Sequence, residues 1–262
     1  MEEAVFIRGI SDLEDLHSKY SRIYFGNEFC QRLIPAEKEI NEILRFTLDK
    51  GLNFTFVTGF VTDAGLKCLE ELLVFISSKA KDAEVVINDW GMLGMVRKHS
   101  LIPVVGRLLT KQKRDPRIIS MLKKIPQKGL KCLQSAAIGP YMMSFLRDNH
   151  VKRVEIDNLP QGVRLEESVV SENLRVSLYF PFNYVTTSRN CIFNDGIEQY
   201  EKTSLFECAR KCRHDTLILK HHSIPMGLYL KGNTVFLENC RMPDEFVRKS
   251  IDRIVYQPAI PM

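Results

Sequence analysis

Residues 53–89, NFTFVTGFVTDAGLKCLEELLVFISSKAKDAEVVIND, decide the fold class of this chain. The run Asn53–Val61 is apolar and rich in Phe and Val, which predicts a buried strand. After Thr62, a suitable N-cap, Asp63–Ala80 places apolar residues at helical spacing, and Glu84–Asp89 is a second apolar strand. A strand, a helix and a strand of these lengths are typical of a βαβ unit with parallel strands.

The same alternation continues on both sides of this unit. Further strands are expected at residues 4–10, 22–26, 102–109, 153–157 and 174–180. Further helices are expected at residues 35–51 and 92–99, near 116–125, and at 130–149 with an interruption at Gly139-Pro140. Five or six such units predict an α/β fold of the (β/α) TIM-like barrel type, complete or incomplete. An open dinucleotide-binding sheet is less consistent with the sequence, because no G-x-G-x-x-G follows the early strands.

The pattern changes after residue 214. Residues 216–220, 226–230 and 234–237, around the turn Lys231-Gly232-Asn233, predict a small antiparallel hairpin unit. Residues 243–256 are expected to form a closing helix. No repeat, low-complexity segment or linker interrupts residues 1–262, so the sequence predicts a single barrel domain.

Composition narrows the class of protein. The 262 residues are 45% hydrophobic, enough for a full core, and no apolar run reaches about 18 residues, so no membrane span is expected. The acidic start MEEAVFIRGISDLED lacks the basic region of a secretory signal, and seven cysteines without a signal indicate a reducing compartment. We therefore expect a cytoplasmic protein. Its net charge of +5 permits an anionic partner without requiring nucleic acid.

The segment 187–214, TSRNCIFNDGIEQYEKTSLFECARKCRH, concentrates cysteines. It contains Cys191 and the CxxxC pair Cys208 and Cys212 in polar surroundings, where thiolates are better metal ligands than core residues. Cys30 follows an early strand of the barrel as Cys191 follows a late one, and the loops after barrel strands share one mouth. Topology therefore favours these four cysteines as one ligand set. The other three fall in predicted helices or in the hairpin unit: Cys68, Cys132 and Cys240.

The spacing of these cysteines along the sequence is consistent with three interpretations. They are scattered structural residues, or ligands of zinc, or ligands of an iron–sulfur cluster. Closed zinc sites usually pair their ligands in two tight knuckles, whereas iron–sulfur clusters accept more varied spacings. The isolated Cys30 and the long spacer between Cys191 and Cys208 therefore favour a cluster, with zinc as the alternative.

The barrel mouth also receives polar residues. Asn88 and Asp89 could orient a substrate or a proton, and Arg107 could clamp an anion with two hydrogen bonds. The competing interpretations are that Asp89 caps the following helix and that Arg107 forms a salt bridge at the rim. The same position after strands is predicted for Thr58, Gly59, Trp90, Gly91, Gly106, Glu155 and Asp157.

Basic residues gather between residues 111 and 131. They are Lys111, Lys113, Arg114, Arg117, Lys123, Lys124, Lys128 and Lys131. Such a run usually forms a solvated helix face; the alternative is a surface that docks RNA or an acidic protein. No G-x-S-x-G, H-E-x-x-H or papain-like order of Cys, His and Asn is present, so the sequence shows no peptidase machinery.

Four stretches resemble the collagenase-like peptidase family (peptidase family U32) over about residues 20–240. They are IYFGNEFC at 23–30, VINDWG at 86–91, VGRLLTKQKRDPR at 105–117, and TSRNC…CARKC at 187–212. The cysteine pattern is most similar to the subgroup of anaerobic ubiquinone-hydroxylation proteins. There, one early cysteine and three later ones that end in CxxxC bind a [4Fe-4S] cluster, which implies Cys30, Cys191, Cys208 and Cys212 here.

The resemblance implies an oxygen-independent hydroxylation or related redox step, on a small molecule or on RNA. It also implies a heteromeric partner from the same family. The alternatives are a collagenase-type protease and a non-catalytic electron-transfer or structural subunit. The chain departs from the peptidase-type members, which carry an extra cysteine where Tyr184 falls and a C-terminal extension that is lacking here. These departures argue against both peptidase activity and RNA hydroxylation.

Overall fold

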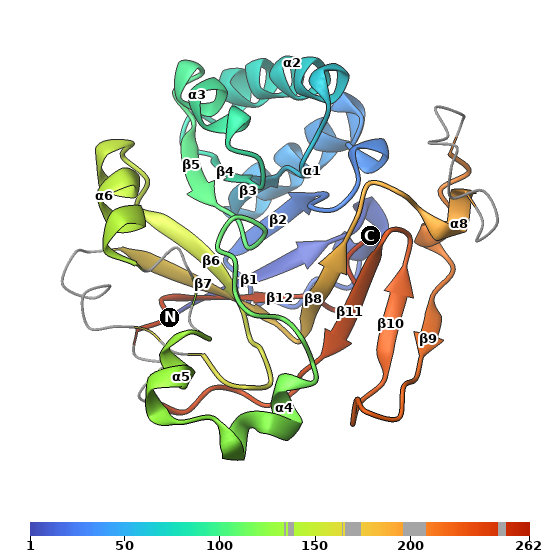
Figure 1. Ribbon diagram of the computed structural model, residues 1–262. Helices are drawn as coiled ribbons and strands as arrows, with labels where there is room; N and C mark the ends of the chain where they lie inside the picture. The colour runs from blue at the N-terminus through green and yellow to red at the C-terminus, as the bar shows by residue number, and fades with distance from the viewer. Residues whose placement is uncertain (134, 136–138, 164, 166–173, 196–207, 246–249) are drawn as a thin grey trace.

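The computed structural model describes residues 1–133, 135, 139–163, 165, 174–195, 208–245 and 250–262. Within these ranges, parallel strands close into an eight-stranded barrel with helices packed around its outside (Figure 1). The predicted TIM-like barrel is therefore confirmed, and it is complete. A four-stranded antiparallel sheet lies beside the barrel.

The barrel strands are short and mostly buried. They are β1 (Glu2–Ile7), β2 (Arg22–Gly26), β3 (Asn53–Val57), β4 (Glu84–Ile87), β5 (Ile102–Val105), β6 (Arg153–Asp157), β7 (Arg175–Phe180) and β12 (Arg253–Tyr256). They follow one another around the barrel in chain order, and β12 closes the ring between β7 and β1. Burial on both faces explains their near-continuous runs of Val, Ile and Phe.

The helices cover the outer face of the barrel. The longer ones are α1 (Glu37–Lys50), α2 (Asp63–Lys79), α3 (Gly91–Lys98) and α6 (Pro140–Asp148); the shorter ones are α4 (Ile118–Met121), α5 (Gln127–Lys131) and α8 (Ile192–Asp195). Single 3₁₀ turns lie at Ile10–Leu13, Gln31–Leu33, Leu122–Lys124 and Lys211–Arg213. The helix expected at 130–149 falls partly outside the described residues. No helix in the described ranges is long and apolar enough to cross a bilayer.

The second sheet has the order β8-β11-β10-β9. Its strands are β8 (Phe182–Thr187), β9 (Leu217–Leu219), β10 (Leu228–Lys231) and β11 (Thr234–Glu238). Strands β9, β10 and β11 are the predicted hairpin unit, which is confirmed. Strand β8 was not expected, although FNYVTT has the β-branched and aromatic composition of a strand.

The closing helix predicted at residues 243–256 is wrong at its C-terminal end. Residues 253–256 form β12, which pairs in parallel with β1 and with β7. Arg253 points into the barrel, and Gln257, the next inward position beyond the strand, is also polar, so Val255 is the apolar inward residue of this strand. Residues 246–249 lie outside the described ranges.

Two hydrophobic regions hold the barrel together. The larger fills the space between the strands and the surrounding helices, and includes Ile43 of α1, Leu73 of α2 and Val96 of α3. The smaller fills the middle of the barrel interior and consists of Ala4, Phe6, Tyr24, Val57, Val86, Val104, Tyr179 and Val255. Inward side chains from all strands must interdigitate there, as in other small barrels.

A charged layer lies below this apolar layer, at the amino end of the strands. Arg253 is 1% exposed and donates to Glu2 Oε2 at 2.6 Å, to Glu84 Oε1 at 3.0 Å and to the Tyr24 hydroxyl at 2.7 Å. These contacts join β12 to β1, β2 and β4 across the interior. The pairing with carboxylates raises the pKa of Arg253 against the opposing effect of burial, so the side chain is a cation.

Glu155 lies within the middle of the barrel without a cationic partner. The Tyr179 hydroxyl donates to its Oε2 at 2.7 Å, and Oε1 accepts no hydrogen bond in the described structure. Burial raises the pKa of this carboxyl to about 8. The side chain is therefore protonated at neutral pH.

This protonation predicts a pH dependence of stability. The unfolded state loses the Glu155 proton near pH 4.5 and the folded state only near pH 8, so raising the pH across this interval favours unfolding. The effect has an upper bound on the order of 5 kcal/mol. Glu155→Gln should remove that part of the slope and make the protein more stable than the parent at pH 8, measured by urea unfolding at pH 5 to 8. The exposed Glu37→Gln is the control. A slope unchanged by Glu155→Gln would contradict an ionisable carboxyl at this place.

Candidate functional site

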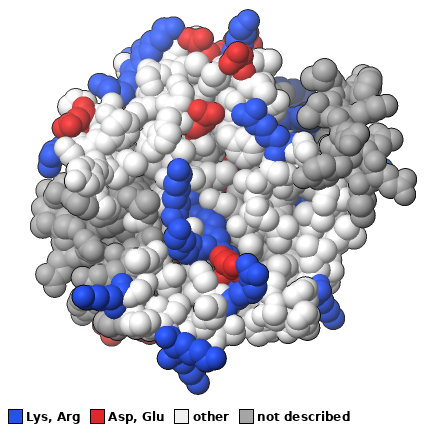
Figure 2. Space-filling model, in the orientation of Figure 1, with Lys and Arg blue, Asp and Glu red and all other residues white. Residues whose placement is uncertain are grey.

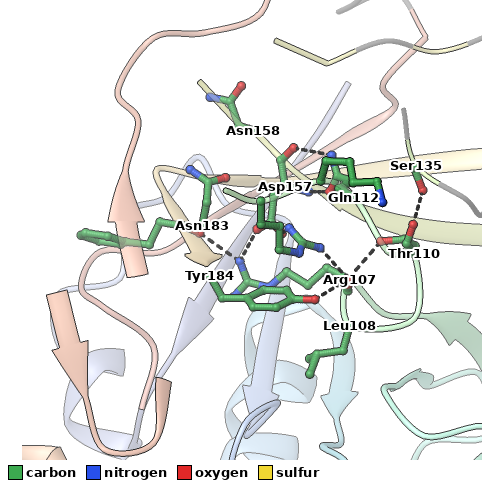
Figure 3. Close-up of polar contacts among 12 residues, drawn as sticks. Arg107, Leu108, Thr110, Gln112, Ser135, Asp157, Asn158, Asn183 and Tyr184 are labelled. Carbon is green, nitrogen blue, oxygen red and sulfur yellow. Dashed lines mark hydrogen bonds and ion pairs between the residues drawn. The ribbon is translucent and has the colours of Figure 1, made fainter. Parts of the chain in front are cut away.

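Arg107 lies completely buried just above the barrel interior, after β5. Its Nε and Nη2 donate to the two carboxylate oxygens of Glu28, with Nη2 to Oε2 at 2.6 Å. Its Nη1 donates to Asp157 Oδ1 at 2.7 Å (Figure 3). Nη1 also donates to the carbonyl of Phe182 at 2.9 Å. With its amide oriented to satisfy both neighbours, Gln257 accepts from Nη2 at 3.0 Å. All five guanidinium N–H groups are thus bonded within the chain.

A second arginine supports this cluster from outside. Arg114 forms an ion pair with Asp157 and donates to the backbone carbonyl of Arg107 at 2.7 Å. Its guanidinium lies over the ring of Tyr184, 3.8 Å from the ring centre, and the Tyr184 hydroxyl donates to the same carbonyl. Gln112 donates to the backbone carbonyl of Asp157 and accepts from its N–H. The loop after β5 is therefore fixed to the end of β6.

The charges of this cluster are balanced in its interior. Glu28 and Asp157 face Arg107, and Arg114 provides a second cation beside Asp157. Burial alone would lower the pKa of Arg107, but the carboxylates of Glu28 and Asp157 raise it. The guanidinium is therefore protonated. Arg107 forms salt bridges at the mouth, as one interpretation of the sequence expected, but its side chain is completely buried and spans from the loop after β2 to the end of β6.

Asn88 and Asp89 take separate positions after β4. Asn88 is buried, donates to the carbonyl of Thr58 at 2.8 Å and accepts from the N–H of Leu108 at 3.1 Å, so it ties three successive loops together. Asp89 accepts from the N–H of Gly91, the first residue of α3, at 2.9 Å. This is the helix-capping interpretation of Asp89. The substrate-binding roles of Asn88, Asp89 and Arg107 stay predictions.

The four cysteines selected from the sequence line one cavity of about 260 Å³ at the barrel mouth. Cys30 follows β2, Cys191 directly precedes α8, Cys208 lies before the 3₁₀ turn Lys211–Arg213, and Cys212 is the middle residue of that turn. Cys212 is buried and the other three are partly exposed. Phe29, Arg32, Phe60, Arg189, Asn190 and Met262 are among the residues that complete the lining. Residues 196–207 of the cysteine-rich segment lie outside the described ranges.

Backbone geometry brings Cys30 to this cavity. Gly26 ends β2 with φ +138°, and a Cβ there would lie 2.0 Å from the carbonyl oxygen of Val57, so only glycine fits. The chain then turns, and the side chain of Asn27 accepts from the N–H groups of Phe29 and Cys30 at 3.0 and 2.8 Å. The glycine therefore allows the turn, and Asn27 holds the cysteine in place.

The hairpin turn between β10 and β11 joins the cysteine loops. Asn233 donates to the carbonyl of Phe29 at 2.7 Å and to that of Ser188, so it connects the loop of Cys30 with the loop of Cys191. Gly232, with φ +61°, lies so close to Cys212 that a Cβ would be 3.1 Å from the cysteine Cβ. The antiparallel sheet thus serves as a frame for the cysteine cavity.

The thiols act on one another electrostatically. Burial, together with negative charge on Cys191, Cys30 and Cys208, raises the pKa of Cys212 to about 11. Burial also raises the pKa of Cys30, with Cys191 and Cys208 acting in the same direction. Four thiolates at this site therefore require a positive group among them. The N–H of Arg210 already donates to Cys208 Sγ at 3.4 Å, the kind of contact that stabilises a bound thiolate.

The cavity is wider than a site for one ion. Among the described residues, no three His, Cys, Asp or Glu side chains converge closely enough to hold a single metal ion. Zinc would require sulfurs within about 2.3 Å of the metal.

The remaining cysteines lie elsewhere. Cys68 on α2, Cys132 after α5 and Cys240 after β11 are exposed, and none of them lines the cavity. The Cys240 thiol donates to Glu238.

Several residues of the site were not selected from the sequence. Glu28 directly precedes Phe29 and Cys30, but a glutamate in a predicted loop gives no signal of complete burial. Asn233 was placed only in a hairpin turn, and Gln257 was given no role. Asp157 was expected at the mouth and is there, whereas Glu155 lies deeper, inside the barrel.

Comparison with known proteins gives one informative result. No family model matches the sequence, and no curated protein matches it. The fold is similar to the solved structure of the U32 peptidase Mk0906, with a TM-score of 0.52 and 11% sequence identity. The similarity covers 100% of this chain and 94% of that one. At this low sequence identity, the comparison shows a shared fold.

The buried cluster generates a prediction of stability. Arg107→Ala leaves Glu28 and Asp157 buried without their main cation, so the free energy of unfolding should fall by about 3–5 kcal/mol. Arg117→Ala removes an exposed pair with Asp115 and should cost at most about 1 kcal/mol. Urea unfolding of both variants checks this. An Arg107→Ala protein as stable as the parent would show that the guanidinium is available for another role.

Proposed function

We propose that Cys30, Cys191, Cys208 and Cys212 hold a [4Fe-4S] cluster, and that the chain serves an oxygen-independent redox step such as a hydroxylation. The observation that carries the proposal is the shared cavity: Cys30 and the three cysteines of the segment 187–214, from two distant parts of the chain, line one opening at the barrel mouth. Thiolates are the usual ligands of such clusters. A cluster of this kind, when bound, exchanges single electrons.

The surroundings of the cavity fit this group. Arg32 and Arg189 among the lining residues provide positive charge near four thiolates, and the N–H of Arg210 already bonds to Cys208. The rings of Phe29 and Phe60, with Met262, give apolar surface that limits access of water. Hydrogen bonding to the sulfurs and solvent exclusion are the two means by which a protein sets the potential of such a group.

Four cysteine ligands leave no iron open for a substrate, which favours electron transfer over Lewis-acid chemistry. The barrel-mouth residues then have a positioning role. Arg107 and Glu28 fix the loop that carries Cys30, and Asn88 fixes the loops after β3, β4 and β5.

The alternative function is peptidase activity, because the protein with the similar fold is described as a U32 peptidase. A hydrolytic site needs an activated nucleophile or a base able to accept a proton. In the described part of the mouth, the buried carboxylates of Glu28 and Asp157 are both bound to arginines. We therefore expect no cleavage of gelatin or peptides by the purified chain.

Metal content tests the proposal. Protein purified without oxygen should be brown and contain about four irons and four sulfides per chain. Cys→Ser at any one of the four ligand positions should lower iron and sulfide sharply, because the remaining thiolates cannot complete the site. Cys68→Ser, Cys132→Ser and Cys240→Ser are matched controls and should keep the full content. Stoichiometric zinc without iron and sulfide would sink the proposal.

A further inference from the structure

A second cavity of about 860 Å³ opens on the other side of Tyr184 from Phe29 and the cysteine site. One wall is the loop of residues 108–117, which follows β5. The other wall is one part of the antiparallel sheet, with Tyr184 and Val185 on β8, Leu219 on β9, Leu228 on β10 and Val235 on β11. We call this cavity the sheet groove.

The loop wall of the sheet groove is strongly basic. Its lining includes Lys111, Lys113, Arg114 and Arg117, against one acidic residue, Asp115. Figure 2 shows Lys and Arg side chains gathered at the centre of this face, over the segment that leads from β5 to α4. Arg114 and Arg117 are bound to carboxylates, whereas Lys111 and Lys113 are exposed and make no ion pair within the described ranges. Two lysines are therefore available to an anionic partner.

The sheet wall is apolar where it faces these lysines. Val185, Leu219, Leu228 and Val235 contribute aliphatic side chains to the groove. An apolar wall beside a basic rim is the usual composition of a protein-docking surface, where apolar contact gives affinity and charge gives orientation.

Two aromatic rings separate the sheet groove from the cysteine cavity. Phe29 lines the cysteine cavity and Tyr184 lines the groove. The two rings are in contact, with centres 5.5 Å apart and an interplanar angle of 58°. A partner in contact with Tyr184 would thus be separated from Phe29, the residue next to Cys30, by a single ring.

We propose that the sheet groove docks an acidic electron-carrier protein, and this rests on the proposed redox function of the cysteine site. Lys111 and Lys113 would pair with carboxylates on the carrier. One electron would leave the reduced carrier and enter the group held by the four cysteines, so that the carrier is oxidised and that group reduced by one electron each. Complexes between electron-carrier proteins and their partners have small interfaces and are short-lived. Attraction between opposite charges mainly accelerates their formation.

Binding to a strongly acidic ferredoxin tests the proposal. We expect Lys111→Glu combined with Lys113→Glu to weaken association by roughly ten-fold or more at low salt, as measured by calorimetry, because attraction becomes repulsion. Lys67→Glu combined with Lys81→Glu changes the net charge equally at exposed sites outside the groove, and should change association by no more than about two-fold. Association of the parent should weaken with added salt, and a basic cytochrome c should not bind.

The same preparations distinguish the two proposals, because iron and sulfide are measured in each. A chain that holds the cluster but binds ferredoxin no better than its Lys111→Glu, Lys113→Glu variant overturns the docking proposal alone. A chain without iron overturns the proposed function whatever it binds. Tighter binding of single-stranded RNA than of ferredoxin, lost in the same variant, would assign the groove to nucleic acid and overturn the docking proposal.

Discussion

The bond between the Arg107 guanidinium and the carboxylates of Glu28 and Asp157 is the constraint on which the barrel mouth depends. All three groups are shielded from water, so each would be costly to bury alone and is acceptable only in the presence of the others. The bonds join the ends of β2, β5 and β6, which are far apart in sequence. Because Glu28 lies two residues before Cys30, the same bonds fix the first cysteine of the cavity. The charge pairing in the interior thus determines the position of Cys30 at the cavity.

The barrel could be predicted from the sequence because its strands are buried on both faces. Runs such as NFTFV and EVVI carry an apolar signal that survives without knowledge of the neighbours, and helices α1 and α2 begin and end close to where Pro35, Gly51 and Thr62 indicate. The assembly of four cysteines at one mouth follows from the same rule, since loops after parallel strands share one end of a barrel. For the barrel strands and the loops that follow them, the local sequence pattern and the topology of the barrel lead to the same prediction.

The parts that could not be predicted depend on contacts between distant residues. Strand β12 carries a buried charge at Arg253, and the carboxylates that make this acceptable, Glu2 and Glu84, lie on other strands. The burial of Arg107 has the same origin. From sequence it resembles a surface arginine, and only Glu28 and Asp157 together account for its place in the interior. No local pattern contains this information, because the compensating charge lies far along the chain.

The position of β12 has a consequence for how the protein is made. This strand is synthesised after every other strand of the barrel, yet it lies between β7 and β1. Until residues 253–256 leave the ribosome, β1 and β7 are open edges with unpaired backbone groups, a state that favours pairing with other chains. The pairing of Glu2 with Arg253 closes a loop of nearly the whole chain, which is among the slowest kinds of contact to form. The four cysteines of the cavity, by contrast, all precede residue 253, so they can come together before the barrel beneath them is closed.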